Sequence, residues 1–243
     1  MSVAVIVLGF LDAFTGAFDF IFNQREATTG GVEVGGLGQI GDLLAKHIEV
    51  SALALAGSLV LAMPAGIWLG HRGKGELLAV AVGNAGRAVP ELALIAFMVA
   101  FVGVGLVNVT IALLVLGIPP ILTNTFTAVR QVDPDAVEAA RGMGMSEPGI
   151  VARVELPLAV PTIMSGVRTA AIAIVATATI APLAGVLTLG DLILSRNVYG
   201  DDGVLAGAIL VALLALAIEL TLAGVQWLLT PRGVRVQRAP ASA

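Results

Sequence analysis

The sequence predicts an all-α membrane protein with about five transmembrane helices. Of its 243 residues, 58% are hydrophobic and only 12% are charged, and the mean hydropathy is +0.99. Soluble domains carry roughly 25% charged residues, so this composition excludes an ordinary soluble protein. Several stretches also reach the ~20 apolar residues that a helix needs to cross a bilayer. Residues 50–70, 92–129 and 169–190 carry no charge, and residues 203–230 carry only Glu219.

These stretches give five predicted spans, at residues 50–70, 80–103, 107–128, 158–183 and 204–229. Gly103-Val104-Gly105 separates the second span from the third, because paired glycines interrupt a helix. Pro119 and Pro120 lie inside the third span. Prolines kink a membrane helix, and here they either shape a translocation pathway or only shape packing.

The distribution of basic residues predicts the orientation of the chain. Ten of the thirteen Lys and Arg residues fall on one side of the predicted spans, and only Arg25, Lys46 and Arg196 fall on the other. Cytoplasmic loops carry the excess of positive charge. We therefore expect the N-terminus outside and the tail 231–243 in the cytoplasm, which makes the loop 130–157 cytoplasmic as well.

The N-terminal segment, residues 1–48, is expected to lie outside the membrane or in its outer interface. Residues 3–22 are apolar but carry two aspartates and no basic residue, unlike the positive start of a secretory signal. We expect an amphipathic interfacial helix there, with a sixth span as the alternative. The glycines of residues 28–31 and 35–36 predict a flexible linker, and residues 40–47 a short interfacial helix.

The loop 130–157 begins with the pattern of a short helix. Asp133 can cap such a helix, and Pro134 suits the first helical position, where a missing N–H costs nothing. This helix is expected to end near Arg141.

A sharp turn and a second short helix are expected next. Gly142 and Gly144 supply the permissive backbone that the turn requires, and Ser146 can cap the second helix. Leu156-Pro157 marks re-entry into the membrane. Two short helices joined at a glycine form a stiff knob, which can pass a push from a soluble motor to membrane helices.

The same loop carries a motif. Glu138-Ala139-Ala140 is followed by Gly144, Val154 and Leu156-Pro157 in the spacing E-A-A-x3-G-x9-[IV]-x-L-P. This resembles the signature of the membrane-spanning permease subunits of binding-protein-dependent ABC importers. The resemblance implies the type I ABC importer permease fold over residues 49–230. It also implies that the following residues couple the chain to an ATPase: Asp133, Glu138, Ala139, Ala140, Gly142, Gly144, Leu156 and Pro157.

Other stretches resemble the permeases of osmoprotectant importers, which take up glycine betaine, choline, carnitine and related quaternary ammonium compounds. This similarity covers roughly residues 47–229. The stretches that carry it are residues 63–67, 89–94, 117–124, 132–134 and 139–146.

One segment departs from that branch. After the fourth span the branch usually reads Gly-Ala-Gly-Gly-Leu-Gly, whereas residues 184–191 read Ala-Gly-Val-Leu-Thr-Leu-Gly-Asp. Gly185 and Gly190 remain candidates for an outer gate, but Val186 and Thr188 replace flexible glycines. A paralogous partner that keeps the usual loop, or neutral drift, would account for the change.

The missing motifs place part of the chemistry on other subunits. The chain has no G-x-x-x-x-G-K-[ST] loop for ATP phosphates and no cysteine, and His47 and His71 are predicted on opposite sides of the membrane. We therefore expect no catalytic residue, metal site or cofactor on this chain, and we place ATP and Mg²⁺ on a separate ABC ATPase subunit.

Further partners follow from the span count. Five spans are too few to enclose a pathway, so a second permease chain, identical or paralogous, is expected. An extracytoplasmic binding protein is expected to supply the solute and most of the specificity, because aromatic residues for cation–π recognition are sparse here. Membrane lipid surrounds the chain, and no feature indicates nucleic-acid binding.

Glu219 and Arg168 are charged residues within or near spans. Glu219 either lines the pathway or relays protons, or it only faces a neighbouring helix. Arg168 is expected to bond exposed carbonyls or lipid headgroups. Two rival functions remain: an importer for another small solute, such as methionine or an oxyanion, and an ion-coupled secondary transporter that uses Glu219. The second would predict inverted repeats, and none is visible in the sequence.

Overall fold

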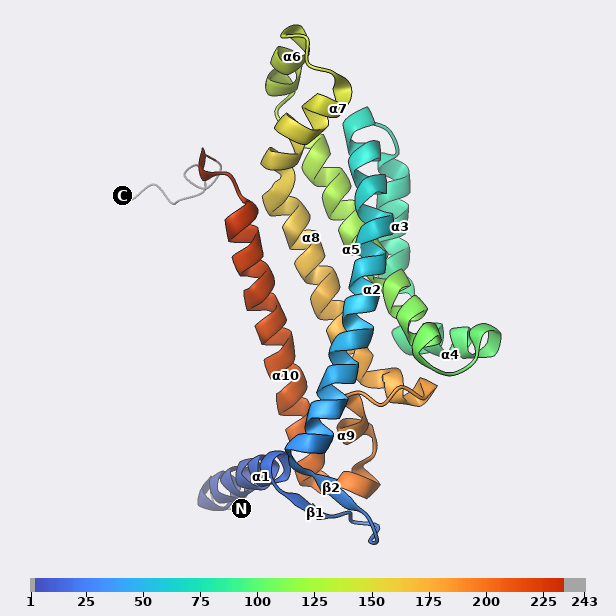
Figure 1. Cartoon of the computed structure of the whole chain (residues 1–243), viewed down its shortest axis with the longest axis vertical. Helices are drawn as coiled ribbons and strands as arrows, with labels where there is room; N and C mark the ends of the chain where they lie inside the picture. The colour runs from blue at the N-terminus through green and yellow to red at the C-terminus, as the bar shows by residue number, and fades with distance from the viewer. Residues whose placement is uncertain (1–2, 234–243) are drawn as a thin grey trace. The chain divides into compact units, whose positions relative to one another are not determined.

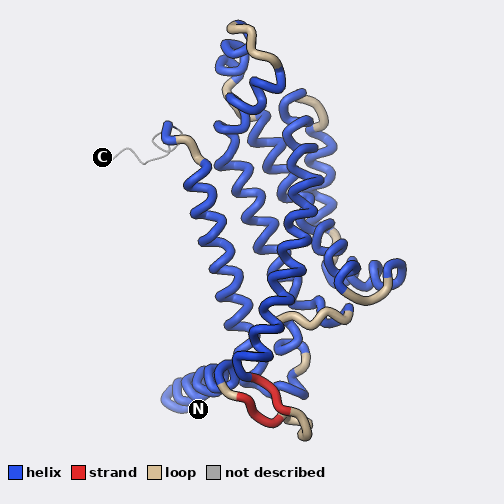
Figure 2. Tube along the Cα trace, viewed as in Figure 1, coloured by secondary structure: helices blue, strands red, loops and turns tan. Residues whose placement is uncertain are grey.

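The computed structural model describes residues 3–233, with only the backbone described for residues 3–8, 10 and 87. Residues 234–243 of the predicted tail lie outside the described residues. Helices make up nearly all of the described chain (Figure 2). The elements are α1 (Val3–Phe22), β1 (Gln24–Glu26), β2 (Glu33–Gly35), α2 (Gly36–Arg72), α3 (Glu76–Ala88), α4 (Glu91–Val102), α5 (Leu106–Arg130), α6 (Pro134–Gly142), α7 (Glu147–Ile150), the π-helical η1 (Val151–Glu155), α8 (Leu156–Thr177), the 3₁₀-helical η2 (Ala178–Ala184), α9 (Gly190–Leu194) and α10 (Arg196–Leu229).

Among the described residues, four helical segments are long and apolar enough to cross a membrane: Gly36–Arg72, Leu106–Arg130, Glu147–Ala184 and Arg196–Leu229. They contain the predicted first, third, fourth and fifth spans. The helices α3 and α4 add a fifth if this broken pair counts as one span. The prediction of an all-helical membrane protein with about five spans is confirmed.

The predicted span 80–103 is wrong as a single helix. Val89 adopts extended backbone, with φ −81° and ψ 118°, between α3 and α4. The cause is Pro90, whose ring disfavours a helical conformation at the preceding residue and which offers no N–H to continue the helix. The next break is where it was predicted, since Gly103 and Gly105 have φ values of +84° and +122° and separate α4 from α5.

The glycine-rich stretch near the N-terminus is a β-hairpin and not the predicted linker. The strands β1 and β2 pair antiparallel, with Arg25 opposite Val34, and Ala27 N donates to Val32 O at 2.7 Å across the turn. The predicted short helix at residues 40–47 is also wrong as a separate element, because α2 is one helix of 37 residues. Periodic apolar residues continue through this region, so nothing ends the helix.

The chain forms two compact units. Unit 1 comprises residues 1–54, 91–113 and 174–217, and unit 2 comprises residues 55–90, 114–173 and 218–243. Within unit 1, α1 runs across the beginnings of α2 and α10 and not along them (Figure 1). The core of unit 1 combines the end of α1, the hairpin, α9 and the starts of α2 and α10. Its buried residues are Ala17, Phe20, Ile21, Ala27, Val34, Ile40, Leu43, Leu189, Leu192, Tyr199 and Ala206.

In unit 2, α2, α3 and α8 approach α5 closely through glycines. A Cβ at Gly86 of α3 would stand 2.2 Å from Pro119 Cγ, and a Cβ at Gly166 of α8 would stand 2.7 Å from the Pro120 carbonyl oxygen. A Cβ at Gly70 of α2 would likewise lie within 3 Å of α5. Small residues at helix contacts are the usual means of close packing in membranes. Pro119 is therefore buried at a helix contact of unit 2, and Pro120 is partly buried with its carbonyl facing α8.

Candidate functional site

The loop 130–157 of unit 2 folds as two short helices, α6 and α7, followed by η1. The Asp133 carboxylate accepts a hydrogen bond from Asp135 N at 2.9 Å and so caps α6. Pro134 occupies the first position of α6, as predicted. Gly144 has a φ of +82° and forms the turn between the helices. Sequence reasoning therefore placed the first helix and the glycine turn correctly.

Two details of that prediction are wrong. Gly142 is the last residue of α6, so Gly144 and not Gly142 supplies the left-handed conformation. Ser146 stands at the cap position of α7, but within the described chain its side chain makes no capping hydrogen bond. Instead Arg141 donates to both carboxylate oxygens of Glu147, at 2.8 and 3.0 Å. This pair closes the turn from outside and raises the pKa of the Arg141 guanidinium.

The signature residues divide between the surface and the interior. Glu138 and Ala139 are exposed, whereas Ala140 is buried. Leu156 and Pro157 begin α8 directly after η1, as the re-entry prediction requires. The α6 helix therefore exposes the Glu138 carboxylate and packs the small Ala140 side chain within the loop.

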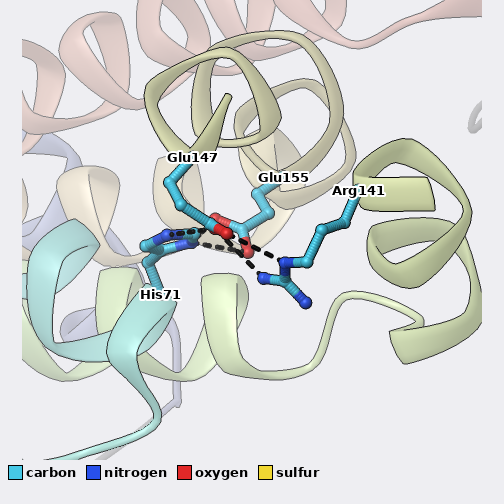
Figure 3. A network of polar contacts seen from close by, with 4 residues as sticks. All are labelled: His71, Arg141, Glu147 and Glu155. Carbon is cyan, nitrogen blue, oxygen red and sulfur yellow. Dashed lines mark hydrogen bonds and ion pairs between the residues drawn. The ribbon is translucent and has the colours of Figure 1, made fainter. Parts of the chain in front are cut away.

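A network of four polar side chains ties this loop to the end of α2 (Figure 3). His71 Nδ1 lies 2.9 and 3.0 Å from the two carboxylate oxygens of Glu155. His71 Nε2 lies 3.2 Å from Glu147 Oε2, and Arg141 holds Glu147 from its other side. Glu155 is only 4% exposed. The network thus joins α2 to α6, α7 and η1.

The hydrogen-bond chemistry of the network depends on His71. An ionised carboxylate only accepts, and both imidazole nitrogens donate only when the ring is protonated. A doubly protonated ring satisfies Glu155 and Glu147 together, whereas a neutral ring satisfies one of them. Because a buried carboxylate is costly without a partner, His71 anchors Glu155. The loop is therefore linked both to α8, which continues from η1, and to α2.

Glu219 and Arg168 contact each other within unit 2. Arg168 Nη2 of α8 donates to Glu219 Oε1 of α10, and Arg168 Nη1 donates to Gln226 Oε1 at 2.8 Å. Gln226 Nε2 donates to the Pro161 carbonyl at 3.4 Å. The expectation that Arg168 bonds free carbonyls or headgroups is therefore wrong. A charge in an apolar medium is costly unless it is paired, and here the partner of Arg168 is the Glu219 carboxylate.

In the loop 184–191 of unit 1, Thr188, one of the residues found in place of a glycine, makes a buried hydrogen bond. Gly185 has a φ of +79° and ends η2. Thr188 is fully buried, and its Oγ1 donates to the Ala178 carbonyl at 2.8 Å. A Cβ at Gly190 would stand 1.8 Å from the Thr179 carbonyl oxygen, so only glycine fits there. Thr188 and Gly190 therefore hold the loop against the start of η2.

Sequence reasoning missed the network around His71. It considered that histidine only as a metal ligand and did not consider Glu155. One signal was available, because Glu155 is a lone acid directly before the apolar start of α8. A carboxylate in that position needs a cation nearby.

Comparisons with known proteins agree with this architecture. Residues 62–232 match the family described as the binding-protein-dependent transport system inner membrane component. The match covers well over half of the chain, so the chain belongs to this family. It is the permease subunit of an ABC importer, a multi-pass inner-membrane component that works with an ATPase and a binding protein and does not itself hydrolyse ATP.

Individual relatives cover most of the chain. It is 38% identical over 194 residues to the carnitine transport permease protein OpuCB of Listeria monocytogenes. The aligned region covers 79% of this chain and 89% of the relative. It is 37% identical over 199 residues to the choline transport system permease protein OpuBB of Bacillus subtilis. This alignment covers 80% of this chain and 92% of the relative. The resemblance read from the motifs is confirmed.

A solved structure supports the fold independently. An inward-facing structure of the MetNI methionine ABC transporter superposes with a TM-score of 0.68 and 20% identity. The superposition covers 80% of this chain and 98% of the other. At this identity the likeness shows the type I permease fold alone.

Proposed function

We propose that this chain is the permease of an importer for quaternary ammonium osmoprotectants such as glycine betaine, choline and carnitine. The observation that carries the proposal is the identity of 35–38% over about 80% of the chain to three permeases named for these solutes. The methionine transporter is similar only in fold, so it lends no support to methionine as the solute.

The coupling loop is the segment 133–157, and α6 is the part that the ATPase contacts. Glu138 offers an exposed charge, and Gly144 sets the angle between the two short helices. Closure of the ATPase dimer pushes the loop, and the bridge through His71 carries part of this push to α2. ATP-driven closure thereby opens the pathway to the outside. ATP hydrolysis then resets the pathway to its starting conformation.

The remaining topology follows from the charge distribution. The N-terminus lies outside and the tail lies in the cytoplasm, so the coupling loop faces the ATPase. The crosswise course of α1 supports an interfacial helix in preference to a sixth span (Figure 1). A second permease chain, identical or paralogous, completes the pathway, with lipid around the pair.

Glu219 has a packing role in this proposal. Its ion pair with Arg168 joins α10 to α8 within unit 2, as expected of an intramembrane charge that neighbouring helices satisfy. A proton relay would need a carboxylate free to exchange protons. Gly185 and Gly190 remain the candidate gate residues, in a loop that faces outward.

The test is uptake of radiolabelled glycine betaine, choline and carnitine by the reconstituted importer, with methionine as a competitor. Wild type should accumulate at least one of the three in an ATP-dependent manner that excess methionine does not reduce. Accumulation of methionine and of none of the three would contradict the solute class.

Two variants test the coupling loop. Glu138→Lys and Gly144→Val should assemble but lose uptake, the first by reversing the contact charge and the second because a β-branched residue disfavours positive φ. Glu76→Lys is the control for charge on another exposed position. Met143→Val is the control for a β-branched residue in the same loop, because Met143 is exposed and has a φ of −77°. Normal uptake by well-expressed Glu138→Lys would contradict the coupling role.

A further inference from the structure

The end of α1 and the β-hairpin pack against the start of α10 within unit 1. We call these residues, 17–35, the N-terminal clamp. Arg25 Nη1 donates to Asp202 Oδ2 at 2.8 Å, and both side chains are about one-third exposed. Thr28 N donates to the Val198 carbonyl at 3.0 Å. The clamp is thus fastened to α10 by an ion pair and by its own backbone.

Tyr199 connects the clamp to the loop 184–191. Phe20 of the clamp is fully buried and meets the Tyr199 ring edge-on, with centroids 6.1 Å apart. On its other side the Tyr199 hydroxyl donates to Asp191 Oδ2 at 2.6 Å. Asp191 N in turn donates to the Thr188 carbonyl at 2.9 Å. Direct contacts therefore run from the clamp through one aromatic ring to the buried centre of the loop.

We propose that the N-terminal clamp holds the loop 184–191 closed between transport cycles, with Tyr199 as the positioning residue. The inference rests on the proposed function, in which this loop is the outer gate. The clamp lies outside residues 62–232, which match the family, whereas the loop lies inside them. The clamp therefore acts on a part of the chain that the family shares.

The physical basis is a shift of an equilibrium between closed and open loop. Contacts made only in the closed state favour that state by their own free energy. The Tyr199 hydroxyl bond reaches Asp191 of the loop directly, and the Arg25 ion pair acts through the clamp, which it holds on α10 beside Tyr199. Their loss should raise the population of the open loop and let solute leak without ATP, while the core around Phe20 keeps the fold.

The experiment measures passive efflux of radiolabelled glycine betaine from vesicles that contain the complete importer and no ATP. Tyr199→Phe removes one hydroxyl and keeps the ring, and Arg25→Gln removes the ion pair with Asp202. Each should raise passive efflux at least threefold, with the melting temperature of the complex unchanged. The double exchange Arg25→Asp with Asp202→Arg should restore low efflux.

Arg196→Gln is the matched control, because it breaks an ion pair with Asp201 at the same end of α10 that is largely exposed and does not reach the clamp. Efflux equal to wild type in Tyr199→Phe and Arg25→Gln, or an equal rise in Arg196→Gln, would overturn the clamp. A lowered melting temperature without increased efflux would also overturn it, since the clamp would then only stabilise the fold. If wild type shows no ATP-driven uptake, the proposed function and the role of the clamp are both overturned. If wild type takes up solute normally but passive efflux is the same in wild type and all variants, only the clamp is overturned.

Discussion

Truncation of His71 should uncouple the permease from its ATPase. His71→Ala removes the imidazole whose Nδ1 lies 2.9 Å from Glu155, a carboxylate that is 4% exposed. A hydrogen bond to a charged group contributes about 1.5–3 kcal/mol, and the His71 side chain is only 17% exposed, so solvent screens it little. We take about 2 kcal/mol as the loss. This lowers the ratio of anchored to released loop roughly thirtyfold, because about 1.4 kcal/mol corresponds to a factor of ten.

The assay is the amount of solute moved per ATP hydrolysed by the reconstituted importer. In His71→Ala this ratio should fall at least tenfold while the ATPase still copurifies. Arg141→Ala is the control, since it removes a pair with Glu147 in which both side chains are 51% exposed. Solvent screens such an exposed pair and leaves it little net stabilisation, so its ratio should fall far less than that of His71→Ala. A wild-type ratio in His71→Ala would refute the reasoning.

Three further predictions concern the packing and the orientation. Glu219→Gln should keep most uptake, because the amide still accepts from Arg168; a loss of more than about tenfold in rate, about 1.4 kcal/mol of barrier, would favour a pathway role. Gly166→Val should lower the melting temperature, because its Cβ would stand 2.7 Å from a backbone oxygen and overpacking costs about 1–3 kcal/mol. Gly224 has open space around it, so Gly224→Val should leave the melting temperature unchanged. Equal shifts in the two variants would contradict close packing at α5. A cysteine at the exposed Lys74 should resist an impermeant thiol reagent in intact cells, while one at Thr29 should react; the opposite labelling would invert the topology.

Local rules predicted the parts of the structure that neighbouring residues decide. The cap at Asp133 and the turn at Gly144 each depend on a few adjacent residues, so their types were sufficient. The break at Pro90 depends on an equally local rule. It was missed because a long apolar run on both sides of the proline favoured one continuous span.

The N-terminal clamp could not be predicted in that way. Arg25 and Asp202 are 177 residues apart, and a glycine-rich stretch is compatible with both a linker and a hairpin turn. What decides between them is the burial of hairpin residues such as Val34 against α1 and α10. That information lies in the packing and not in any single segment.

The acid–base pairs of unit 2 could be predicted from the sequence only in part. His71 and Arg168 are basic residues beside apolar runs, and Glu155 and Glu219 are acids in similar positions, so these four residues can form two sets of acid–base pairs. Depth along the helices selects one. His71 and Glu155 each lie within two residues of the end of a long helix, whereas Arg168 follows the first residue of α8 by twelve residues and Glu219 precedes the last of α10 by ten. An isolated charge in an apolar medium is far costlier than a paired one, so pairing between charges at similar depth is favoured. The structure joins His71 to Glu155 and Arg168 to Glu219.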